Sequence, residues 1–501
     1  MRNPRAVTVL NSTEACDLAI IGGGPAGMAA AIIACGLELE VCLLDEQPRL
    51  GGQIYRQPPR EFRVESWLPG ATYNKGKALI ARAEALTHLR HIAPATVWAC
   101  FKGSRDGQPG FGHEVLFHND ETIGRVRARH VLIACGCYEA PLPFPGWQLP
   151  GVMSAGGIQT ILKSQRVAAG RTIVLAGTHP LLFVVAEQLL AAEIRIAAVV
   201  LAQRAGAGWR LARAPRAAFT GSKQLWKMLG TLVQLRRARV PVLFGHGVVD
   251  ALGTRELEGV RVRELGNRGK STVIPCDALG VCYGFLPSSE LARQAGAIHL
   301  GTRDGGWVTE CDDYMRSSVP GLSVAGELAG VAGAEAAALS GEIAALSVAL
   351  DLGRVSIEAA NTRRQNLQKR WQRLRRVAAV LADLSTPAPA FVARIGERST
   401  LLCRCEDITI GQVEDAVRAD PGVSSASTAK LLTRAGMGFC QGRMCEINVR
   451  RIIAHERKMP LAEVAGFVVH PPVKPVPLGA LAAYPEALEI DPSALGSPLG
   501  R

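Results

Sequence analysis

The sequence is poor in aromatic residues and has no long uninterrupted apolar stretch. Aromatic residues make up 5% of the 501 residues. No apolar run reaches the roughly 18 residues that a membrane-spanning helix needs, so we expect no transmembrane segment. The first fifteen residues are polar and lack the apolar region of a secretory signal peptide. These absences predict a cytoplasmic protein, although its basic surface leaves peripheral membrane contact open.

A recognition module for nucleic acid is also missing, although the net charge is +13. Basic residues are spread along the chain apart from clusters at 236–239 and 363–376, and no interleaved aromatic residues accompany them. We therefore expect no nucleic-acid partner and interpret the charge as a solvated or partner-facing surface. In a cytoplasmic protein the 13 cysteines are expected to be free thiols or cluster ligands rather than disulfides.

Length and composition favour an α/β protein with more than one domain. A chain of 501 residues is too long for a single core, and about three domains are expected. The 53 glycines, together with the scarcity of aromatic residues, indicate a fold with many close backbone contacts.

The rest of the chain is organised around a stretch near its start that reads as strand, glycine turn, helix and strand. Its glycines keep the G-x-G-x-x-G spacing, which allows a tight turn, backbone access to a pyrophosphate and close helix–strand packing. The turn and helix start comprise Gly22, Gly24, Pro25, Ala26 and Gly27. Asp45 ends the second strand, where a carboxylate is expected to accept hydrogen bonds from a ribose hydroxyl.

The turn after Asp45 has paired glycines, which allow the backbone to lie against a flat ligand. At this point the sequence resembles the flavin-dependent disulfide-reductase-like superfamily, whose members have two dinucleotide-binding domains. The resemblance implies FAD rather than free NAD at the first site. It places Glu46, Gly52 and Gln53 in the cofactor site, with the glycines and the glutamine approaching the flavin.

Three later segments are similar to further flavin-binding segments of that superfamily. Val97 falls where a backbone group pairs with adenine. A buried strand beginning at residue 130 ends in small residues, and the resemblance assigns Ala134 and Gly136 to the second flavin motif. Gly326 and Glu327 stand at the closing motif, where Glu327 replaces an aspartate that contacts the ribityl or phosphate region.

A second strand–turn–helix pattern begins at residue 171 and is a degenerate copy of the first. Gly177 supplies the tight turn, but His179 and Leu182 stand where the second and third glycines belong. The next strand ends without an acid for ribose, although Arg204 is placed to meet a phosphate. We expect the fold of an NAD(P) domain with poor NAD(P) binding. A further FMN or nucleotide at this second site or at a subunit interface stays open.

No catalytic acid, base or dithiol stands out. The sequence shows no arrangement of His, Tyr and Arg that would clamp a substrate carboxylate. Cys135 and Cys137 are separated by one residue, unlike the Cys-x-x-Cys of a dithiol catalyst, and are interpreted as small core residues. The catalytic residues therefore stay unassigned.

Four cysteines form two close pairs in the C-terminal part of the chain. Four thiolates in this arrangement suit a tetrahedral zinc or an iron–sulfur cluster. Arg404 and Arg443 flank these ligands, and positive charge there favours a reduced cluster. The four candidate ligands are Cys403, Cys405, Cys440 and Cys445.

The cysteine module resembles the bacterioferritin-associated-ferredoxin-like [2Fe-2S] domain. The four-residue spacing of its second pair is typical of the larger, FAD-binding subunits of opine oxidases, hydroxyproline or proline dehydrogenases and hydrogen cyanide synthase. This resemblance covers essentially residues 15–480. It implies an electron-transfer subunit with FAD and a [2Fe-2S] cluster, in a heteromer that oxidises a secondary amine or amino acid. It further implies a second catalytic subunit that contains FAD, and it leaves a small third subunit open.

The expected fold is α/β, with two Rossmann-like domains of the disulfide-reductase type and a small α-rich iron–sulfur domain. We expect the FAD-binding domain over 15–150 and 286–352, and the NAD(P)-binding-like domain over 151–285. A basic helix and linker over 353–390, the [2Fe-2S] domain over 391–470 and a proline-rich tail over 471–501 follow.

Two other functions stay open at this point. The first is a self-contained NAD(P)H-dependent reductase that passes electrons through its cluster to a protein acceptor. His179 and Leu182 in the second turn argue against this function. The second is a non-enzymatic assembly subunit with a zinc-stapled tail, which zinc without iron would favour.

Overall fold

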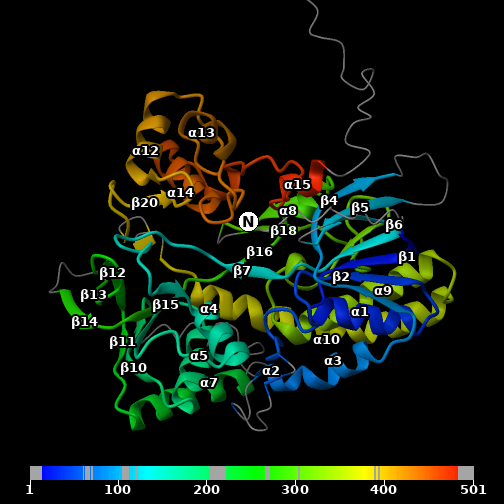
Figure 1. The fold of residues 1–501 in the computed structure, drawn as a ribbon, viewed down its shortest axis with the longest axis horizontal. Helices are drawn as coiled ribbons and strands as arrows, with labels where there is room; N and C mark the ends of the chain where they lie inside the picture. The colour runs from blue at the N-terminus through cyan, green and yellow to red at the C-terminus, as the bar shows by residue number, and fades with distance from the viewer. Residues whose placement is uncertain are drawn as a thin grey trace, which may run out of the picture.

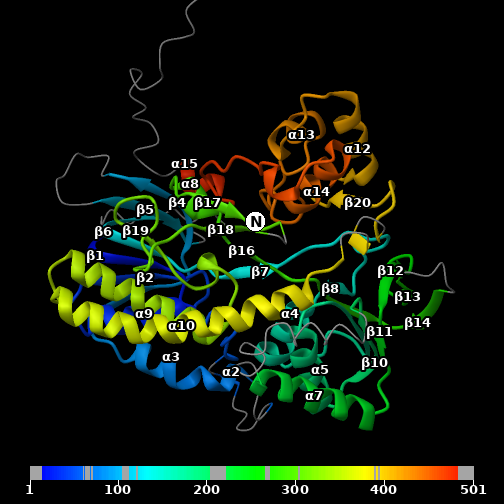
Figure 2. The same ribbon diagram turned by 180° about the vertical axis from the view of Figure 1, so that it is seen from behind.

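The computed structural model describes residues 14–59, 61–62, 68, 72–103, 112–119, 122–203, 222–265, 271–302, 305–388, 391–392 and 395–482. Figures 1 and 2 show two α/β halves side by side, with a small helical module above them. The first half carries the N-terminal strands, and the second half lies around β10 and β15.

A seven-stranded sheet forms the first half, in the order β3-β2-β1-β6-β5-β4 with β19 paired to β6. Strands β3, β2, β1, β6 and β19 run parallel, whereas β4, β5 and β6 form an antiparallel meander. Because β19 comes late in the chain, the chain returns to this sheet after building the second half. The strands are β1 (Glu14–Ile21), β2 (Val41–Leu44), β3 (Leu89–Ile92), β4 (Thr96–Lys102), β5 (His113–His118), β6 (Ile123–Ile133) and β19 (Leu322–Val324).

Helices α1 and α9 pack together on one face of this sheet, and α10 lies against α9 (Figure 2). Side chains alternate along β1: Leu18 and Ile20 join the core under these helices, whereas Ala19 and Ile21 face the other side. Trp371 of the basic helix α10 is buried in the same core. The helices of this half are α1 (Pro25–Cys35), α2 (Thr72–Lys75), α3 (Lys77–Glu84), α8 (Glu290–Gln294), η3 (Gly326–Ala329), α9 (Ala334–Asp351) and α10 (Ile357–Ser385).

The second half is built on a five-stranded parallel sheet in the order β11-β10-β9-β15-β8. These strands are β8 (Val152–Ser154), β9 (Thr172–Gly177), β10 (Arg195–Leu201), β11 (Val242–Phe244) and β15 (Ala278–Cys282). An antiparallel sheet of β12 (His246–Leu252), β13 (Gly259–Glu264) and β14 (Ser271–Pro275) lies beside it. The helices are α4 (Ala155–Thr160), the π-helix η1 (Ile161–Gln165), α5 (Leu181–Ala191) and α7 (Ser222–Arg237).

Two short antiparallel strand pairs lie outside the main sheets. Strand β7 (Cys137–Glu139) leaves the first half, and β16 (Phe285–Pro287) returns antiparallel beside it. A second antiparallel pair, β17 (His299–Gly301) and β18 (Trp307–Thr309), precedes β19. The two halves are therefore joined by crossing strands as well as by α10, which extends from one half to the other (Figure 2).

The helical module follows α10 and contains the four cysteines. Two of its helices begin at capping boxes: Thr409 and Gln412 start α12, and Ser425 and Thr428 start α13. The Trp147 indole donates a 2.7 Å hydrogen bond to the Leu401 carbonyl, which holds the module on the segment between β7 and β8. Its elements are β20 (Leu401–Cys403), β21 (Ile408–Thr409), α12 (Ile410–Ala419), α13 (Ala426–Thr433), α14 (Glu446–Arg457), η4 (Leu461–Glu463) and the outlying α15 (Leu478–Ala482).

The expected fold class is confirmed, with two α/β halves and a small α-rich module near the C-terminus. Within the ranges described above, no helix combines the length and the apolar character needed to cross a membrane.

Candidate functional site

A cavity of about 1020 Å³ extends from the glycine turn after β1 into the second half. Of the residues predicted to bind the cofactor, only Gly27 does not line it. The predicted residues on its wall are Gly22, Gly24, Pro25, Ala26, Asp45, Glu46, Gly52, Gln53, Val97, Ala134, Gly136, Gly326 and Glu327. The fold thus brings segments that are far apart in the sequence to one cavity.

The glycine turn presents bare backbone to this cavity. Gly22 has φ +110°, and a Cβ there would lie 2.5 Å from the Ala134 carbonyl oxygen. A Cβ on Gly27 would lie 1.9 Å from the Gly22 oxygen, so this glycine allows α1 to pack against the turn. At Gly24, in contrast, the nearest atom would be 3.9 Å away on Gly52. The turn therefore has the shape that a dinucleotide pyrophosphate needs at a helix N-terminus.

Asp45 lies at the end of β2 with its carboxylate held by backbone groups. The Gly23 N–H donates to Oδ2, and the Gln47 N–H donates to Oδ1 at 2.6 Å. Burial raises the pKa of this carboxyl group, and the two N–H donors oppose the rise. Because each carboxylate oxygen has two lone pairs, acceptor capacity is left for a ribose hydroxyl.

Arg56 lines the same cavity and was not singled out from the sequence. Its Nε is buried without a hydrogen-bond partner. Burial lowers the pKa of the guanidinium, and the charge of Asp45 opposes that change. A half-buried cation with an unused donor fits the negative charge of a pyrophosphate. Nothing in the local pattern marks this arginine, since only the three-dimensional fold directs it to the cavity.

Lys163 is a second residue that the sequence pattern did not reveal. It is 1% exposed, and its Nζ donates to the Gln53 carbonyl at 2.6 Å and to Gln159 Oε1 at 3.3 Å. Burial lowers the pKa of Lys163 to about 8, with a smaller effect from the nearby Arg56 charge. The π-helix η1 of the second half therefore holds the turn that is expected to approach the flavin.

The Glu327 side chain is also held by backbone N–H groups. Its carboxylate accepts hydrogen bonds from the N–H groups of Ala332 at 2.7 Å and Gly333 at 3.0 Å. Burial raises its pKa against the effect of these donors. The side chain thus shapes the loop that leads into α9, on the wall of the cavity.

The degenerate turn of the second half is filled by side chains, as its sequence predicted. The His179 ring packs edge-on against Phe285 at 4.8 Å, and its Nδ1 accepts a 3.1 Å hydrogen bond from the Leu181 N–H. Burial lowers the pKa of His179 to about 4, so the ring is neutral near pH 7. Leu182 is fully buried in the core. Arg204, the candidate phosphate ligand, lies outside the described residues.

The cavity continues past His179 as an arm lined by residues of α5, α7 and α10. Val184 of α5, Met228 of α7 and Leu381 of α10 line this arm. Lys227, Glu187 and Thr231 line the cavity as well, so its walls here are of mixed polarity.

The four cysteine thiols lie in two contacting pairs. The Cys403 sulfur accepts a hydrogen bond from the Cys445 thiol, which together with nearby N–H groups lowers the pKa of Cys403 to about 6 against the effect of burial. The Cys405 sulfur is within hydrogen-bonding reach of both the thiol and the backbone N–H of Cys440. The N–H groups that point at Cys403 come from Gly436, Glu406 and Cys405.

This donor set fits an iron–sulfur cluster in its chemistry, because thiolates surrounded by backbone N–H groups are typical of such sites. Among the described residues, however, no group of three or more His, Cys, Asp or Glu side chains meets the geometry of a metal site.

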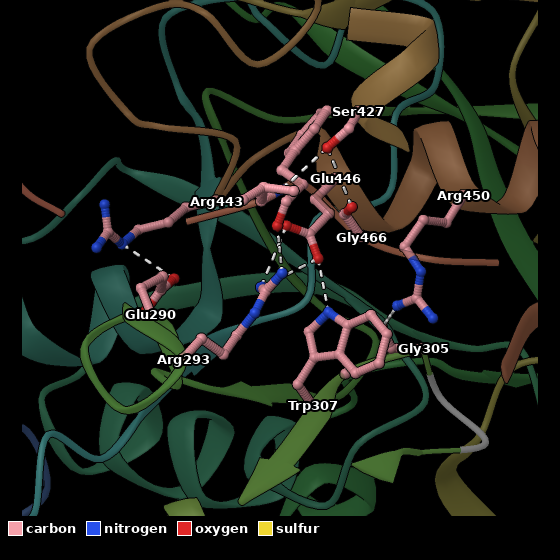
Figure 3. Close-up of polar contacts among 12 residues, drawn as sticks. Glu290, Arg293, Gly305, Trp307, Ser427, Arg443, Glu446, Arg450 and Gly466 are labelled. Atoms are coloured by element: carbon pink, nitrogen blue, oxygen red, sulfur yellow. Dashed lines mark hydrogen bonds and ion pairs between the residues drawn. The ribbon is translucent and has the colours of Figure 1, made fainter. Parts of the chain in front are cut away.

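The cysteine module is joined to the first half by a polar network (Figure 3). Glu446, the first residue of α14, accepts hydrogen bonds from the Trp307 indole at 2.6 Å and from Arg293 at 3.3 Å. Arg450 lies over the Trp307 ring at 4.1 Å. Arg443 pairs with Glu290 at 3.2 Å and also lines the large cavity. Arg443 of the loop from Cys440 to Cys445 therefore contacts both this network and the cofactor cavity.

Comparison with known proteins agrees with each part. Residues 17–63 match the FAD dependent oxidoreductase family, residues 227–353 the pyridine nucleotide-disulphide oxidoreductase family and residues 397–484 the sarcosine oxidase A3 domain. The structure is similar to L-proline dehydrogenase from P. horikoshii, with a TM-score of 0.69 and 20% identity over 94% of this chain and 80% of that one. This likeness supports the fold.

The sequence relatives cover nearly the whole chain. The A subunit of opine oxidase from Agrobacterium tumefaciens is 36% identical over 94% of this chain and 92% of its own length. The HcnB subunit of hydrogen cyanide synthase from Pseudomonas aeruginosa is 36% identical over 85% of this chain and 90% of its own length. This chain therefore belongs to the family of FAD-dependent oxidoreductases that contains these opine oxidase and hydrogen cyanide synthase subunits.

Proposed function

We propose that this chain is the electron-transfer subunit of a heteromeric dehydrogenase or oxidase that acts on a secondary amine or amino acid. In this proposal it holds FAD in the large cavity and a [2Fe-2S] cluster at Cys403, Cys405, Cys440 and Cys445. A partner subunit with its own FAD oxidises the substrate. A further FMN or nucleotide and a small third subunit are compatible with this assembly.

The single observation that carries the proposal is the position of the second cysteine pair. Arg443 stands between Cys440 and Cys445 in the sequence and lines the cofactor cavity. Its Nη1 donates to the Cys440 carbonyl at 3.2 Å. One side chain thus contacts both the cysteine loop and the space for FAD, which supports electron transfer between two centres held by this chain.

Two redox groups in one chain have a physical purpose. A flavin accepts electrons in pairs and passes them on singly, whereas an iron–sulfur cluster carries one at a time. The protein's own task is then to bind and orient. In this proposal the glycine turn and Arg56 would bind the pyrophosphate and Asp45 the ribose, while Lys163 holds the Gln53 turn.

The choice of an amine or amino acid as substrate rests on the relatives. They include the A subunit of opine oxidase and the alpha subunit of sarcosine oxidase. Because these relatives are named as subunits, they support a heteromer for this chain as well. Opines such as octopine and nopaline, or hydroxyproline and proline, are the substrates that we propose.

The first experiment is a visible spectrum of anaerobically purified protein, with iron, zinc and acid-labile sulfide measured on the same sample. We expect flavin bands, a broad absorption at longer wavelength, and about two irons and two sulfides per chain. Zinc without sulfide would overturn the one-electron path and favour a zinc-stapled assembly subunit.

A second experiment tests the division of labour. The isolated chain is assayed with octopine, nopaline, hydroxyproline and proline, with and without its partner subunit. We expect substrate oxidation only in the reconstituted complex. Equal rates for the isolated chain would contradict the proposal, and anaerobic reduction of its flavin by NADH would favour a self-contained reductase.

A further inference from the structure

A proline-rich strap near the C-terminus, residues 471–477, crosses the first half and leads into α15. Its backbone joins the edge strand β4, because the Val473 N–H donates to the Trp98 carbonyl at 2.8 Å. His118 Nε2 lies 3.1 Å from the Pro475 carbonyl oxygen. Ala480 of α15 is buried beside Trp98, so the strap is held at both ends.

Two strap residues reach the cofactor cavity. Val473 and Lys474 line it together with Val97, the residue expected beside adenine. The Val473 side chain is buried in the same core cluster as Val97. Lys474 forms an ion pair with Glu46, which follows the ribose acid Asp45. Burial lowers the pKa of Lys474 to about 8, and the charge of Asp45 opposes this change.

Arg443 links the strap to the cysteine loop. Its Nη2 donates to the Val473 carbonyl at 3.0 Å, and its Nη1 donates to the Cys440 carbonyl at 3.2 Å. Its Nε lies 3.2 Å from Glu290 Oε1. One guanidinium therefore holds three segments together: the cysteine loop, the strap and helix α8.

We propose that the strap is a wall of the FAD site over its adenosine end, and that Arg443 couples this wall to the cysteine loop. FAD then leaves the cavity only after the strap lifts from β4, and lifting is easier when the Arg443 contacts are lost. The proposal rests on FAD in the cavity, as the family indicates, and requires neither a metal nor an amine substrate.

The coupling has a reciprocal consequence. If the closed strap raises the affinity for FAD, bound FAD must stabilise the closed strap by the same free energy. Strap contacts should therefore be better protected in the FAD-loaded protein than in the FAD-free protein.

The rate of FAD release tests the wall directly. FAD-loaded full-length protein is diluted, and released flavin is followed by its fluorescence. We expect Lys474→Met to release FAD about tenfold faster, because a charged contact beside the adenosine end is lost. Lys369→Met, at an exposed lysine on α10, is the matched control and should release FAD at the wild-type rate. A wild-type release rate for Lys474→Met would contradict the proposal that the strap is a wall of the FAD site.

The link to the cysteine loop has its own variant. Arg443→Lys keeps the positive charge but cannot bond three acceptors in one plane. Compared at equal iron content, this variant should release FAD several-fold faster than the wild type. If Lys474→Met accelerates release and Arg443→Lys does not, the strap is still a wall of the FAD site. The proposal that Arg443 couples it to the cysteine loop is then wrong.

A measurement on the wild-type protein tests the proposal without depending on how the variants fold. Hydrogen exchange of the Val473 amide, which donates to Trp98, is followed with and without FAD. Slower exchange with FAD is expected. Equal exchange would overturn the proposal, whereas the metal and substrate assays above decide the electron-transfer function independently.

Discussion

The indole Nε1 of Trp307 donates a 2.6 Å hydrogen bond to Oε1 of Glu446, and this contact joins strand β18 to the first residue of α14. Arg293 of α8 binds the same carboxylate, and its Nη2 also donates to the Phe467 carbonyl. Arg293 and Glu446 are both largely buried. The Glu446 carboxylate is therefore one of the contacts that position the cysteine module relative to the cofactor cavity.

We expect Glu446→Ala to lower the free energy of unfolding by about 2 to 3 kcal/mol, because it removes the acceptor of the indole N–H and the carboxylate partner of a largely buried guanidinium. Urea unfolding measures the loss, and limited proteolysis reports whether the module detaches. Glu463→Ala, at an exposed residue of η4, is the control and should be close to wild type. Equal stability of both variants would contradict this role of Glu446.

Arg450 is fully buried, and its guanidinium donates to three carbonyl groups. We expect Arg450→Lys to destabilise the protein by about 2 to 4 kcal/mol, because an ammonium cannot reach acceptors on Gly305, Leu461 and Val464 at once. Thermal unfolding is the measurement. Arg370→Lys, which keeps an exposed ion pair with Glu335, should change stability by less than about 0.5 kcal/mol.

Two glycines of the first turn should respond differently to alanine. Gly24→Ala has room in the protein but places a methyl group on the cavity wall. We expect normal folding of the FAD-free chain with FAD affinity reduced about a hundredfold, or ~2.7 kcal/mol. Gly27→Ala would place Cβ 1.9 Å from the Gly22 oxygen, so it should destabilise the fold itself. Flavin titration and thermal unfolding distinguish the two, and tight FAD binding by Gly24→Ala would refute the assignment.

Acid should destabilise the protein partly through His179. Burial lowers its pKa to about 4 in the folded chain, from the ordinary value of 6.5. Between these pH values the unfolded chain binds a proton that the folded chain does not, so stability falls as the pH falls from about 6.5 to about 4. Over this pH interval we expect the free energy of unfolding of His179→Gln to fall by about 1 to 3 kcal/mol less than that of the wild type. The exposed His88→Gln is the control, and parallel pH curves for wild type and His179→Gln would contradict the prediction.

The cysteine pairs can be tested by their metal content. We expect Cys440→Ser to lose most of its iron and long-wavelength absorption while it still binds FAD at saturating concentration, because the thiolate ligand is replaced by a hydroxyl. Cys311→Ala, in the first half, should retain its iron and serves as the control. Full iron content in Cys440→Ser would remove Cys440 from the ligand set.

Much of the first site was accessible from the sequence because its signals are local. The glycine turn and Asp45 belong to one short stretch, in which the tight turn and the strand end are determined by neighbouring residues. The resemblance added Val97, Ala134 and Glu327, and the fold places all three at the same cavity. The loss of the glycine pattern in the second turn was also a local signal, since His179 and Leu182 replace glycines. The domain limits and the four cysteine ligands stay predictions.

The sequence by itself determined the two dinucleotide-binding patterns, the degenerate second turn and the cysteine spacing, because each depends on residues close together along the chain. Only the tertiary structure decided that Arg56 faces the cavity, that Lys163 holds the Gln53 turn, and that Lys474 reaches Glu46. Those contacts join residues from different elements, and a side chain's partner across such a distance depends on how sheets and helices pack. No local pattern of residues specifies that packing.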